Sequence, residues 1–306
     1  MSLVSILKGA GPSGFGYGST AEQVTEGLDL TGKTYLVTGC ATGLGRETVR
    51  VLRLRGANVL GTGRTEARAN ETCGPLGATP LACELSEPTS VLACVDQIQQ
   101  RDVKLDAIIC NAGIMCPPEL VLQHGFESQF FTNHVGHFLL ATRLLPSLKP
   151  EGRVVVVSSN AHRRAPAVGI DFDNLSGTRG YEPWKAYGMS KLANLLFARQ
   201  LAKRLAGTGQ TVNALHPGVI ATDLTRSMGM GVKLGFAVGT VLAFKSIPEG
   251  AATQVYLAVH PQVAGKTGKY FADCNEKDST PQGKDMAQAE KLWSVTEEIL
   301  ASWVRN

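Results

Sequence analysis

Tyr187 and Lys191 are the residues whose types and spacing first point to chemistry. They lie four residues apart in an amphipathic segment that starts at Pro183, a residue suited to the first turn of a helix, so both side chains should share one helical face. A phenol titrates near pH ~10 and is a poor base at neutral pH, but an adjacent ammonium favours the phenolate. We therefore expect Lys191 to lower the pKa of Tyr187 and to make it a general acid or base, unless the pair is an ordinary contact on a helix surface. A second pair with this spacing, Tyr181 and Lys185, is excluded because Pro183 disfavours the helical turn that would align it.

Three glycines, Gly39, Gly43 and Gly45, directly follow the apolar run TYLV at 34–37. We expect a strand to end here and a helix to begin near Gly43. A helix N-terminus carries unpaired N–H groups and about half a positive charge, and glycine lets the backbone turn tightly and approach a pyrophosphate. The spacing therefore predicts a dinucleotide-binding loop, with an ordinary strand-to-helix turn as the alternative.

The second expected strand ends in an arginine rather than in an acidic residue. Folds of this kind that bind NAD usually place Asp or Glu about 20 residues after the glycines, where it binds the ribose 2′-hydroxyl. Here that strand ends at Gly63 and Arg64, with no acid. The guanidinium groups of Arg46 and Arg64 match the oxygens of a 2′-phosphate, so we expect NADP(H) to be preferred over NAD(H). The alternative is a pair of ordinary surface arginines.

Alternating strands and helices must position these residues. Strands are expected at 34–38, 57–61, 79–83, 107–110, 153–158, 211–216 and 269–272. Helices are expected at 43–55, 86–101, 124–146, 183–206, 249–258 and 284–304. Strands that are apolar throughout are buried on both faces, so the pattern predicts an α/β fold with a doubly wound, mostly parallel Rossmann-type sheet. We expect an N-terminal extension at 1–30 and one domain at 31–306, with an apolar insertion at 222–248.

Composition excludes several other classes of protein. The net charge of +4 is small, and no Lys/Arg run is long enough for a nucleic-acid site. The seven cysteines form no C-x-x-C pair, which favours reduced thiols in a cytoplasmic protein; Cys40 is unusual in a glycine loop, but we expect no redox role for it. His134 and His137 share a helical face without a third ligand, so no metal site is expected. No run reaches the ~18 apolar residues of a membrane span, and the N-terminus does not resemble a secretory signal.

Six motifs occur in the order and spacing of the short-chain dehydrogenase/reductase family, which the chain resembles over about residues 31–304. They are TGCATGLG at 38–45, NAG at 111–113, NHVGHFLL at 133–140, VVVVSS at 154–159, YGMSK at 187–191 and HPGVIAT at 216–222. FDNL at 172–175, SKLANLLF at 190–197 and EGAATQVYLA at 249–258 are similar to the retinol-dehydrogenase-like branch. Residues 11–29 resemble the chloroplast translocon-associated members and their bacterial relatives.

The resemblance implies a catalytic tetrad of Asn133, Ser159, Tyr187 and Lys191. Tyr187 would exchange a proton with the carbonyl or alcohol oxygen, while Lys191 would bind the nicotinamide ribose and lower the tyrosine pKa. Ser159, with Ser158 as the alternative, would orient the substrate oxygen, and Asn133 would hold a water in a proton relay to Lys191.

The resemblance also implies the contacts to the cofactor. They are Gly39, Thr42, Gly43, Leu44, Gly45, Arg46, Arg64, Glu84, Leu85, Asn111, Ala112, Gly113, Tyr187, Lys191, Pro217, Gly218, Ile220 and Thr222. Glu84 stands where the family usually has an adenine-contacting Asp, and its carboxylate is one methylene further from the backbone. Residues 217–222 would pack on the nicotinamide.

The insertion at 222–248 corresponds to the loop that covers the substrate in the family. It contributes the apolar residues Leu224, Met228, Met230, Leu234, Phe236, Val241, Leu242 and Phe244. These residues predict a lid over a bulky apolar aldehyde, ketone or alcohol, unless they pack on a helix, a partner chain or a membrane surface.

The resemblance leaves two further functions open. One is a catalytically weak regulatory protein that senses the cofactor, and the other is an NAD-linked epimerase or dehydratase. The intact tetrad argues against the first, and the lack of a large sugar-nucleotide domain argues against the second. Dimers or tetramers are common in the family, and a monomer is equally compatible with the sequence.

Overall fold

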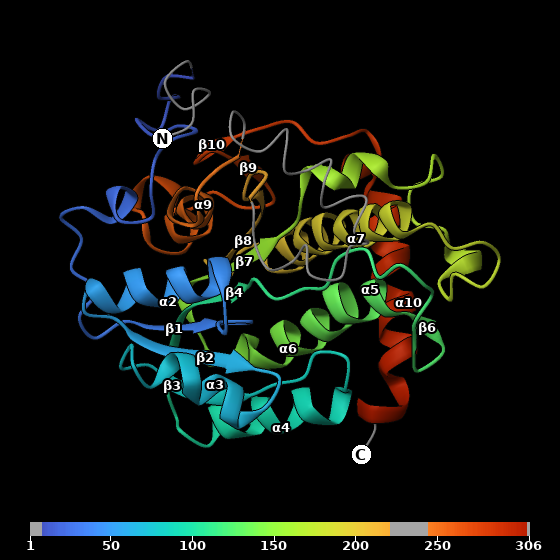
Figure 1. Ribbon diagram of the computed structural model, residues 1–306, viewed down its shortest axis with the longest axis horizontal. Coiled ribbons are helices and arrows are strands. Elements are labelled where there is room, and N and C mark those ends of the chain that lie inside the picture. Colours follow the sequence, from blue (N-terminus) through green and yellow to red (C-terminus); the bar gives the residue numbers. More distant parts are fainter. Residues whose placement is uncertain (1–7, 221–243, 305–306) are drawn as a thin grey trace.

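The computed structural model describes residues 8–220 and 244–304, in which a central sheet lies between helices (Figure 1). Within these residues, eight strands form the sheet in the order β10-β9-β8-β7-β4-β1-β2-β3. Their bounds are β1 (Thr34–Val37), β2 (Asn58–Gly63), β3 (Thr79–Ala82), β4 (Leu105–Cys110), β7 (Leu148–Val157), β8 (Thr211–His216), β9 (Tyr270–Ala272) and β10 (Asn275–Glu276). Neighbouring strands are parallel except β9 and β10, which confirms the predicted mostly parallel sheet.

Helices cover both faces of the sheet. The sheet thereby divides the hydrophobic core into two halves. The helices are α2 (Gly43–Leu54), α3 (Glu66–Cys73), α4 (Pro88–Gln99), α5 (Ser128–Phe130), α6 (Gly136–Leu144), α7 (Pro183–Arg204), α9 (Ile247–Val259) and α10 (Met286–Val304). In β1, Tyr35 and Val37 join the half under α2 and α9, whereas Leu36 joins the half under α4, α6 and α7. Because side chains alternate along a strand, burial of both faces explains why the strands are apolar throughout.

Two parts of the chain differ from the expected elements. Helix α3 was not expected, because its sequence EARANETC is polar and buries only Ala69, Thr72 and Cys73. The expected helix at 124–146 is instead a hairpin of β5 (Leu122–Gln123) and β6 (Phe126–Glu127), followed by α5, a π-helical turn η2 (Phe131–Val135) and α6. A π-helical turn has no distinct sequence period, and such turns are frequent at functional sites.

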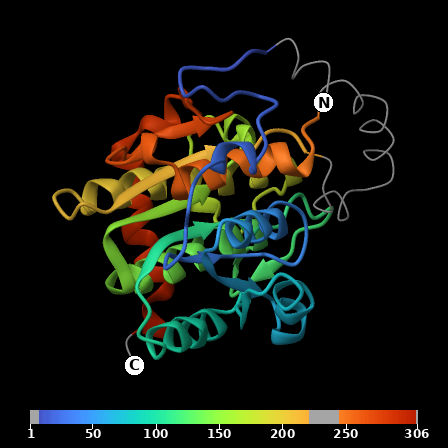
Figure 2. The ribbon, with the colours of Figure 1, turned by 90° about the vertical axis from the view of Figure 1, so that its left-hand side faces the viewer.

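The N-terminal residues 8–30 lie across α9 and the turn between β9 and β10, as Figure 2 shows for the blue segment beside the orange helix. The Phe15 ring packs edge-on against Tyr256, with 5.8 Å between ring centroids. Asn275 accepts a hydrogen bond from the Ser13 N–H at 3.0 Å and donates one to the Phe15 carbonyl at 2.9 Å. This segment therefore packs as part of the same folded unit as the sheet.

At the other end of the chain, α10 covers α6 and α7. Leu292, Trp293 and Leu300 are buried, and the Trp293 ring lies 4.7 Å from the Phe138 ring of α6. Within the described ranges, no helix combines the length and the apolar character needed to cross a membrane.

Candidate active site

The expected site residues converge at one edge of the sheet, where the parallel strands end. The glycine loop follows β1, Asn111 follows β4, Ser159 follows β7 and Pro217 follows β8. Ligands bind at this carboxyl edge in doubly wound folds. Helix α7 crosses the same edge and brings Tyr187 and Lys191 to it.

Tyr187 is buried, 6% exposed, and Ser159 is close enough to its phenol to lower the tyrosine pKa. Ser158 instead donates its hydroxyl proton to the Lys191 carbonyl at 2.7 Å, which ties β7 to α7. Ser159 rather than Ser158 therefore contacts the tyrosine. The Lys191 ammonium lies 5.7 Å from the centre of the Tyr187 ring, so the two side chains share a helical face as expected.

Burial sets the protonation of this pair. It raises the pKa of Tyr187, the hydrogen bond to Ser159 only partly offsets this effect, and the nearby Cys116 thiol adds to it. Burial also lowers the pKa of Lys191 to about 8. The expectation that Lys191 lowers the pKa of Tyr187 is therefore wrong for the chain by itself. The reason is geometric, since the ammonium donates to the Val157 carbonyl at 3.1 Å rather than to the phenol.

Asn133 lies in the π-helical turn η2 and is completely buried. Its side chain accepts from the Ile114 N–H at 2.8 Å and donates to the Ile114 carbonyl and to Ser190 Oγ, both at 3.0 Å. These bonds hold the segment after β4 against α7. A Cβ added at Gly113 would lie 2.9 Å from Asn133 Oδ1 and 3.5 Å from Lys191 Nζ, so only glycine fits between the two side chains.

The glycine loop has the shape of a cradle. Gly39 and Gly43 have positive φ angles of 68° and 58°, which favour glycine. A Cβ at Gly45 would collide with the Gly39 carbonyl and would lie 2.7 Å from Asn111 Nδ2. Thr42, the N-cap of α2, makes no side-chain capping bond, so the first turn of α2 keeps N–H groups for an anion. The loop therefore fits a nucleotide pyrophosphate.

His137 connects this loop to the catalytic side and was not among the expected site residues. Thr38 Oγ1 accepts hydrogen bonds from the backbone N–H groups of Asn111 and Ala112, at 2.9 and 3.0 Å, and contacts His137 Nε2 at 2.9 Å. His137 Nδ1 lies 2.9 Å from the Asn133 carbonyl. Because a carbonyl only accepts, Nδ1 carries the proton and Nε2 accepts from Thr38.

His134 and His137, which share a helical face, have separate hydrogen-bond partners. His134 Nε2 contacts Thr296 Oγ1 of α10 at 3.0 Å, whereas His137 faces β1. Among the residues described, no group of three or more His, Cys, Asp or Glu side chains is placed to hold a metal ion.

Of the two arginines expected to bind the 2′-phosphate, Arg64 directly follows β2 and Arg46 lies on α2. The Arg64 side chain is 72% exposed, and its Nε lies 3.7 Å from Glu84 Oε2. Ser86 also donates to the Glu84 carboxylate at 2.9 Å, so this acid is already engaged. Arg46 is exposed on the first turn of α2, and Leu85 is buried in the core.

The remaining expected contacts surround the turn after β8. Gly218 has a φ of 105°, and a Cβ there would lie 2.6 Å from Lys245 Cδ. Lys245 has a side chain only 1% exposed, and its Nζ pairs with Asp273 at 2.6 Å. This buried ion pair supports the turn at residues 217–219 and was not expected from the sequence.

The side chains of Leu44 and Ile220, two expected contacts, both pack on Gly250 of α9. Thr222 and the expected lid residues from Leu224 to Leu242 lie outside the described residues.

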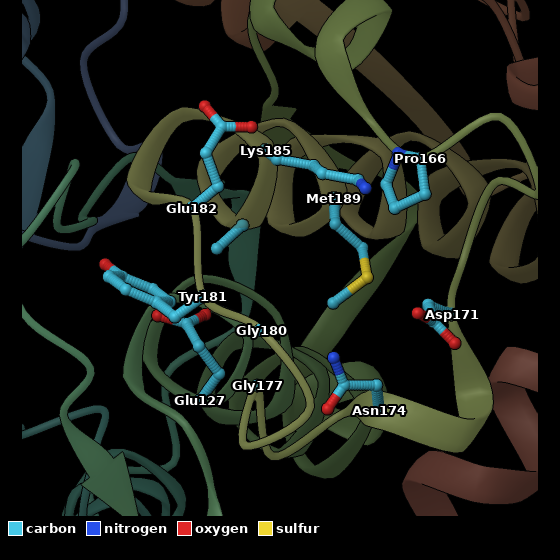
Figure 3. Close-up of a pocket in the computed structure, with 11 residues that line it drawn as sticks. Glu127, Pro166, Asp171, Asn174, Gly177, Gly180, Tyr181, Glu182, Lys185 and Met189 are labelled. Atoms are coloured by element: carbon cyan, nitrogen blue, oxygen red, sulfur yellow. The ribbon is translucent and has the colours of Figure 1, made fainter.

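A pocket that is partly open to solvent borders α7 (Figure 3). It is lined by Glu127, Pro166, Asp171, Asn174, Gly177, Gly180, Tyr181, Glu182, Lys185, Ala186 and Met189. Figure 3 shows Met189 projecting from α7 toward Asn174. None of the expected catalytic residues lines this pocket. Tyr181, the tyrosine of the excluded pair, donates to the Pro117 carbonyl at 2.7 Å.

Comparison with known proteins places the chain in a family. Residues 39–258 match the family model described as enoyl-(acyl carrier protein) reductase, one of the models of short-chain dehydrogenases. The chain belongs to the short-chain dehydrogenase/reductase family, as its motifs predicted. It is therefore a member of an oxidoreductase family whose fold binds a nicotinamide cofactor.

Individual relatives agree with the predicted branch. The chain is 40% identical to the short-chain dehydrogenase TIC 32 B, chloroplastic, of Brassica napus, over 99% of both chains. It is also 40% identical to human retinol dehydrogenase 14, over 88% of this chain and 86% of that protein.

Solved structures share the fold. A crystal structure of an uncharacterised protein from Mycobacterium paratuberculosis has a TM-score of 0.74 and 30% identity, covering 90% of this chain and 96% of its own. A short-chain dehydrogenase from Burkholderia cenocepacia in complex with NADP has a TM-score of 0.64 and 24% identity, covering 79% and 96%.

Proposed function

We propose that the protein is an NADP(H)-dependent oxidoreductase that interconverts a carbonyl group and an alcohol on a bulky apolar substrate. The observation that carries this proposal is the meeting of Tyr187, Ser159, Lys191 and Asn133 at the strand edge that also holds the glycine loop. A cofactor-binding protein without catalysis needs the loop but not the tyrosine–serine contact.

Proton transfer is assigned to Tyr187. When bound, the nicotinamide supplies the hydride in reduction and accepts it in oxidation. The raised pKa of Tyr187 keeps its phenol protonated at neutral pH, which suits a proton donor to a carbonyl oxygen. Ser159 Oγ, which acts on the phenol, orients the same oxygen.

Lys191 and Asn133 are assigned positioning roles. The Lys191 ammonium uses one N–H on the Val157 carbonyl, which leaves N–H donors for the ribose hydroxyls of the cofactor. Both amide N–H groups of Asn133 are engaged, by the Ile114 carbonyl and by Ser190, and its Oδ1 accepts from the Ile114 N–H, so the side chain positions the loop after β4. The expected water relay from Asn133 to Lys191 remains part of the proposal.

The preference for NADP(H) rests on Arg46 and Arg64. Both are exposed at the carboxyl edge, and the 3.7 Å separation of Arg64 from Glu84 is too long for a hydrogen bond, so its donors remain available to a phosphate. The preference for a bulky apolar substrate rests on the composition of the insertion and on the relatives named retinol dehydrogenase. A reducing compartment such as the cytoplasm is supported by seven cysteines that are all buried free thiols.

The first experiment measures NADPH and NADH consumption by the purified protein with aldehydes and ketones of increasing chain length. We expect NADPH-dependent turnover that Tyr187→Phe reduces by a factor of about 10²–10⁴, because the proton donor is lost. Tyr181→Phe is the matched control and should retain turnover. Equal rates for wild type and Tyr187→Phe would remove Tyr187 from its role. NADPH binding without turnover of any carbonyl would favour the regulatory alternative.

The cofactor preference is tested by Arg64→Asp. This change removes a charge-assisted contact worth about 1.5–3 kcal/mol and offers an acid to the ribose hydroxyls. We expect the ratio of kcat/KM for NADPH to that for NADH to fall on the order of tenfold to a hundredfold. Arg68→Asp makes the same charge change in α3, where Arg68 pairs with Glu71, and should leave the ratio unchanged. An unaltered ratio in Arg64→Asp would show that Arg64 does not contact the phosphate.

A further inference from the structure

Two buried thiols meet beside the glycine loop. Cys40 lies in the loop and Cys73 is the last residue of α3; both are 0% exposed, and their sulfur atoms lie 3.4 Å apart. Gly61 of β2 makes room for them, because a Cβ there would collide with Cys73 Sγ and would lie 2.9 Å from Cys40 Sγ. The sequence separates the two cysteines and gave no reason to pair them.

The end of α3 also holds the loop through polar contacts. Thr72 Oγ1 donates to the Ala41 carbonyl at 3.1 Å. The Cys40 N–H donates to the Thr62 carbonyl of β2 at 3.0 Å, and the Cys40 thiol contacts the same oxygen at 3.1 Å. A movement of Cys73 toward Cys40 is therefore transmitted directly to the backbone of the loop.

We propose that Cys40 and Cys73 form a disulfide when a peroxide oxidises the protein, and that this disulfide weakens nucleotide binding at the glycine loop. The effect on binding rests on the cofactor site proposed above, whereas formation of the bond does not.

The reaction balances with hydrogen peroxide as the oxidant. The Cys73 thiolate attacks one peroxide oxygen, so that an S–O bond forms, the O–O bond breaks, and hydroxide leaves with the thiol proton as water. Cys40 Sγ then attacks Cys73 Sγ, so that the S–S bond forms, the S–O bond breaks, and hydroxide leaves with the Cys40 thiol proton as a second water. Each sulfur loses one electron, and the peroxide gains two. The hydrogen bond from Cys40 lowers the pKa of Cys73, which supports Cys73 as the attacking thiolate.

The geometry indicates that a Cys40–Cys73 disulfide would disturb the glycine loop. An S–S bond of about 2.0 Å is more than 1 Å shorter than the present contact, so the loop, α3 or both must shift by roughly that amount. The loop has no spare room, since a Cβ at Gly39 would lie 2.8 Å from Ala112 Cβ. Helix α3 begins two residues after Arg64, so its shift also displaces the arginine assigned to the 2′-phosphate.

The test uses the full-length protein, reduced and then treated with hydrogen peroxide. Alkylation and peptide mass spectrometry detect a Cys40–Cys73 disulfide, and titration with NADPH gives the Kd before oxidation, after it, and after dithiothreitol. Displaced loop N–H groups lose their alignment with the pyrophosphate, so we expect the Kd to rise at least about tenfold, equivalent to about 1.4 kcal/mol, and to recover on reduction. Saturating NADPH should slow formation of the disulfide.

Variants separate this pair from the other cysteines. Cys73→Ala, and Cys40→Ser as a second variant, should lose the peroxide effect on Kd. Cys274→Ala, at a buried cysteine in the β9–β10 turn, should keep it. Absence of the disulfide, or its presence with an unchanged Kd, would overturn the proposal. Failure of the reduced protein to bind NADPH would overturn the cofactor assignment together with the effect on binding.

Discussion

At the scale of single residues, His137 connects two halves of the candidate site. Its Nδ1–H donates to the carbonyl of Asn133, and its Nε2 accepts from Thr38, which in turn accepts from the backbone after β4. Burial lowers the pKa of His137 to about 4, and the charge of Lys191 adds to this effect. The hydrogen bond to the Asn133 carbonyl raises the pKa but does not offset the lowering. The neutral imidazole is therefore the form that fits this network, because a protonated Nε2 could not accept from Thr38.

Because several histidines have lowered pKa values in the folded chain, we expect the free energy of unfolding to fall in acid. Burial lowers the pKa of His134 to about 3 and that of His216 to about 4, as it lowers that of His137. In the unfolded chain these histidines have a pKa near ~6.5. At a pH between that value and the lower folded pKa values, the unfolded chain binds more protons than the folded chain. The free energy of unfolding therefore falls as the pH drops from about 6.5 to 4. Urea unfolding at pH 7 and pH 4.5 should show this fall.

The variant His137→Gln should show a smaller fall, since one of the histidines with a lowered pKa no longer titrates. His124→Gln, at an exposed histidine, is the control and should follow wild type. An unchanged free energy of unfolding between pH 7 and pH 4.5 in wild type would contradict the prediction.

At the scale of elements, α7 is fixed by close backbone contact. A Cβ added at Gly188 would lie 2.7 Å from the Ala161 carbonyl oxygen and 2.8 Å from the Ala165 nitrogen, in the segment that follows Ser159. The absence of a side chain at Gly188 thus brings α7 close enough for Tyr187 to reach Ser159. Arg164 of the same segment lies 4.8 Å above the Trp184 ring, which adds a second contact near the start of α7.

Substitution at this contact should affect both stability and catalysis. Gly188→Ala must push α7 away from backbone atoms, so we expect a loss of about 1–3 kcal/mol in the free energy of unfolding. We also expect a lower kcat, because Tyr187 moves relative to Ser159. Gly9→Ala, at a glycine with open space around its Cβ position, should behave as wild type. Wild-type stability and kcat in Gly188→Ala would show that the contact does not position Tyr187.

The sequence allowed prediction of those parts of the fold and site that rest on local pattern. The strands were predicted because burial on both faces makes each one apolar throughout, and the face shared by Tyr187 and Lys191 followed from the helical repeat. The contact between Thr38 and His137 joins residues 99 positions apart, and the pair of Lys245 and Asp273 depends on a left-handed turn at Asp273. No local pattern marks such contacts. The pKa of Tyr187 was mispredicted because it depends on burial and on where the Lys191 ammonium points.

At the scale of the whole molecule, the N-terminal and C-terminal segments pack on opposite halves of the hydrophobic core. The C-terminal helix α10 packs on α6 and α7 behind the candidate site, through Trp293 and its neighbours. The N-terminal residues 8–30 lie on the opposite half of the core, where they join α9 to the β9–β10 turn. Lys245, whose ammonium lies 4.7 Å above the Tyr17 ring, brings this segment next to the turn at 217–219.

The position of the N-terminal segment has a consequence for synthesis of the chain. The hydrogen bond between Ser13 and Asn275 joins residues 262 positions apart, and Phe15 packs on Tyr256. The ribosome makes this segment well before the residues on which it docks. Residues 8–30 therefore dock only after those later residues have been made, and until then the Phe15 ring is left uncovered on the nascent chain.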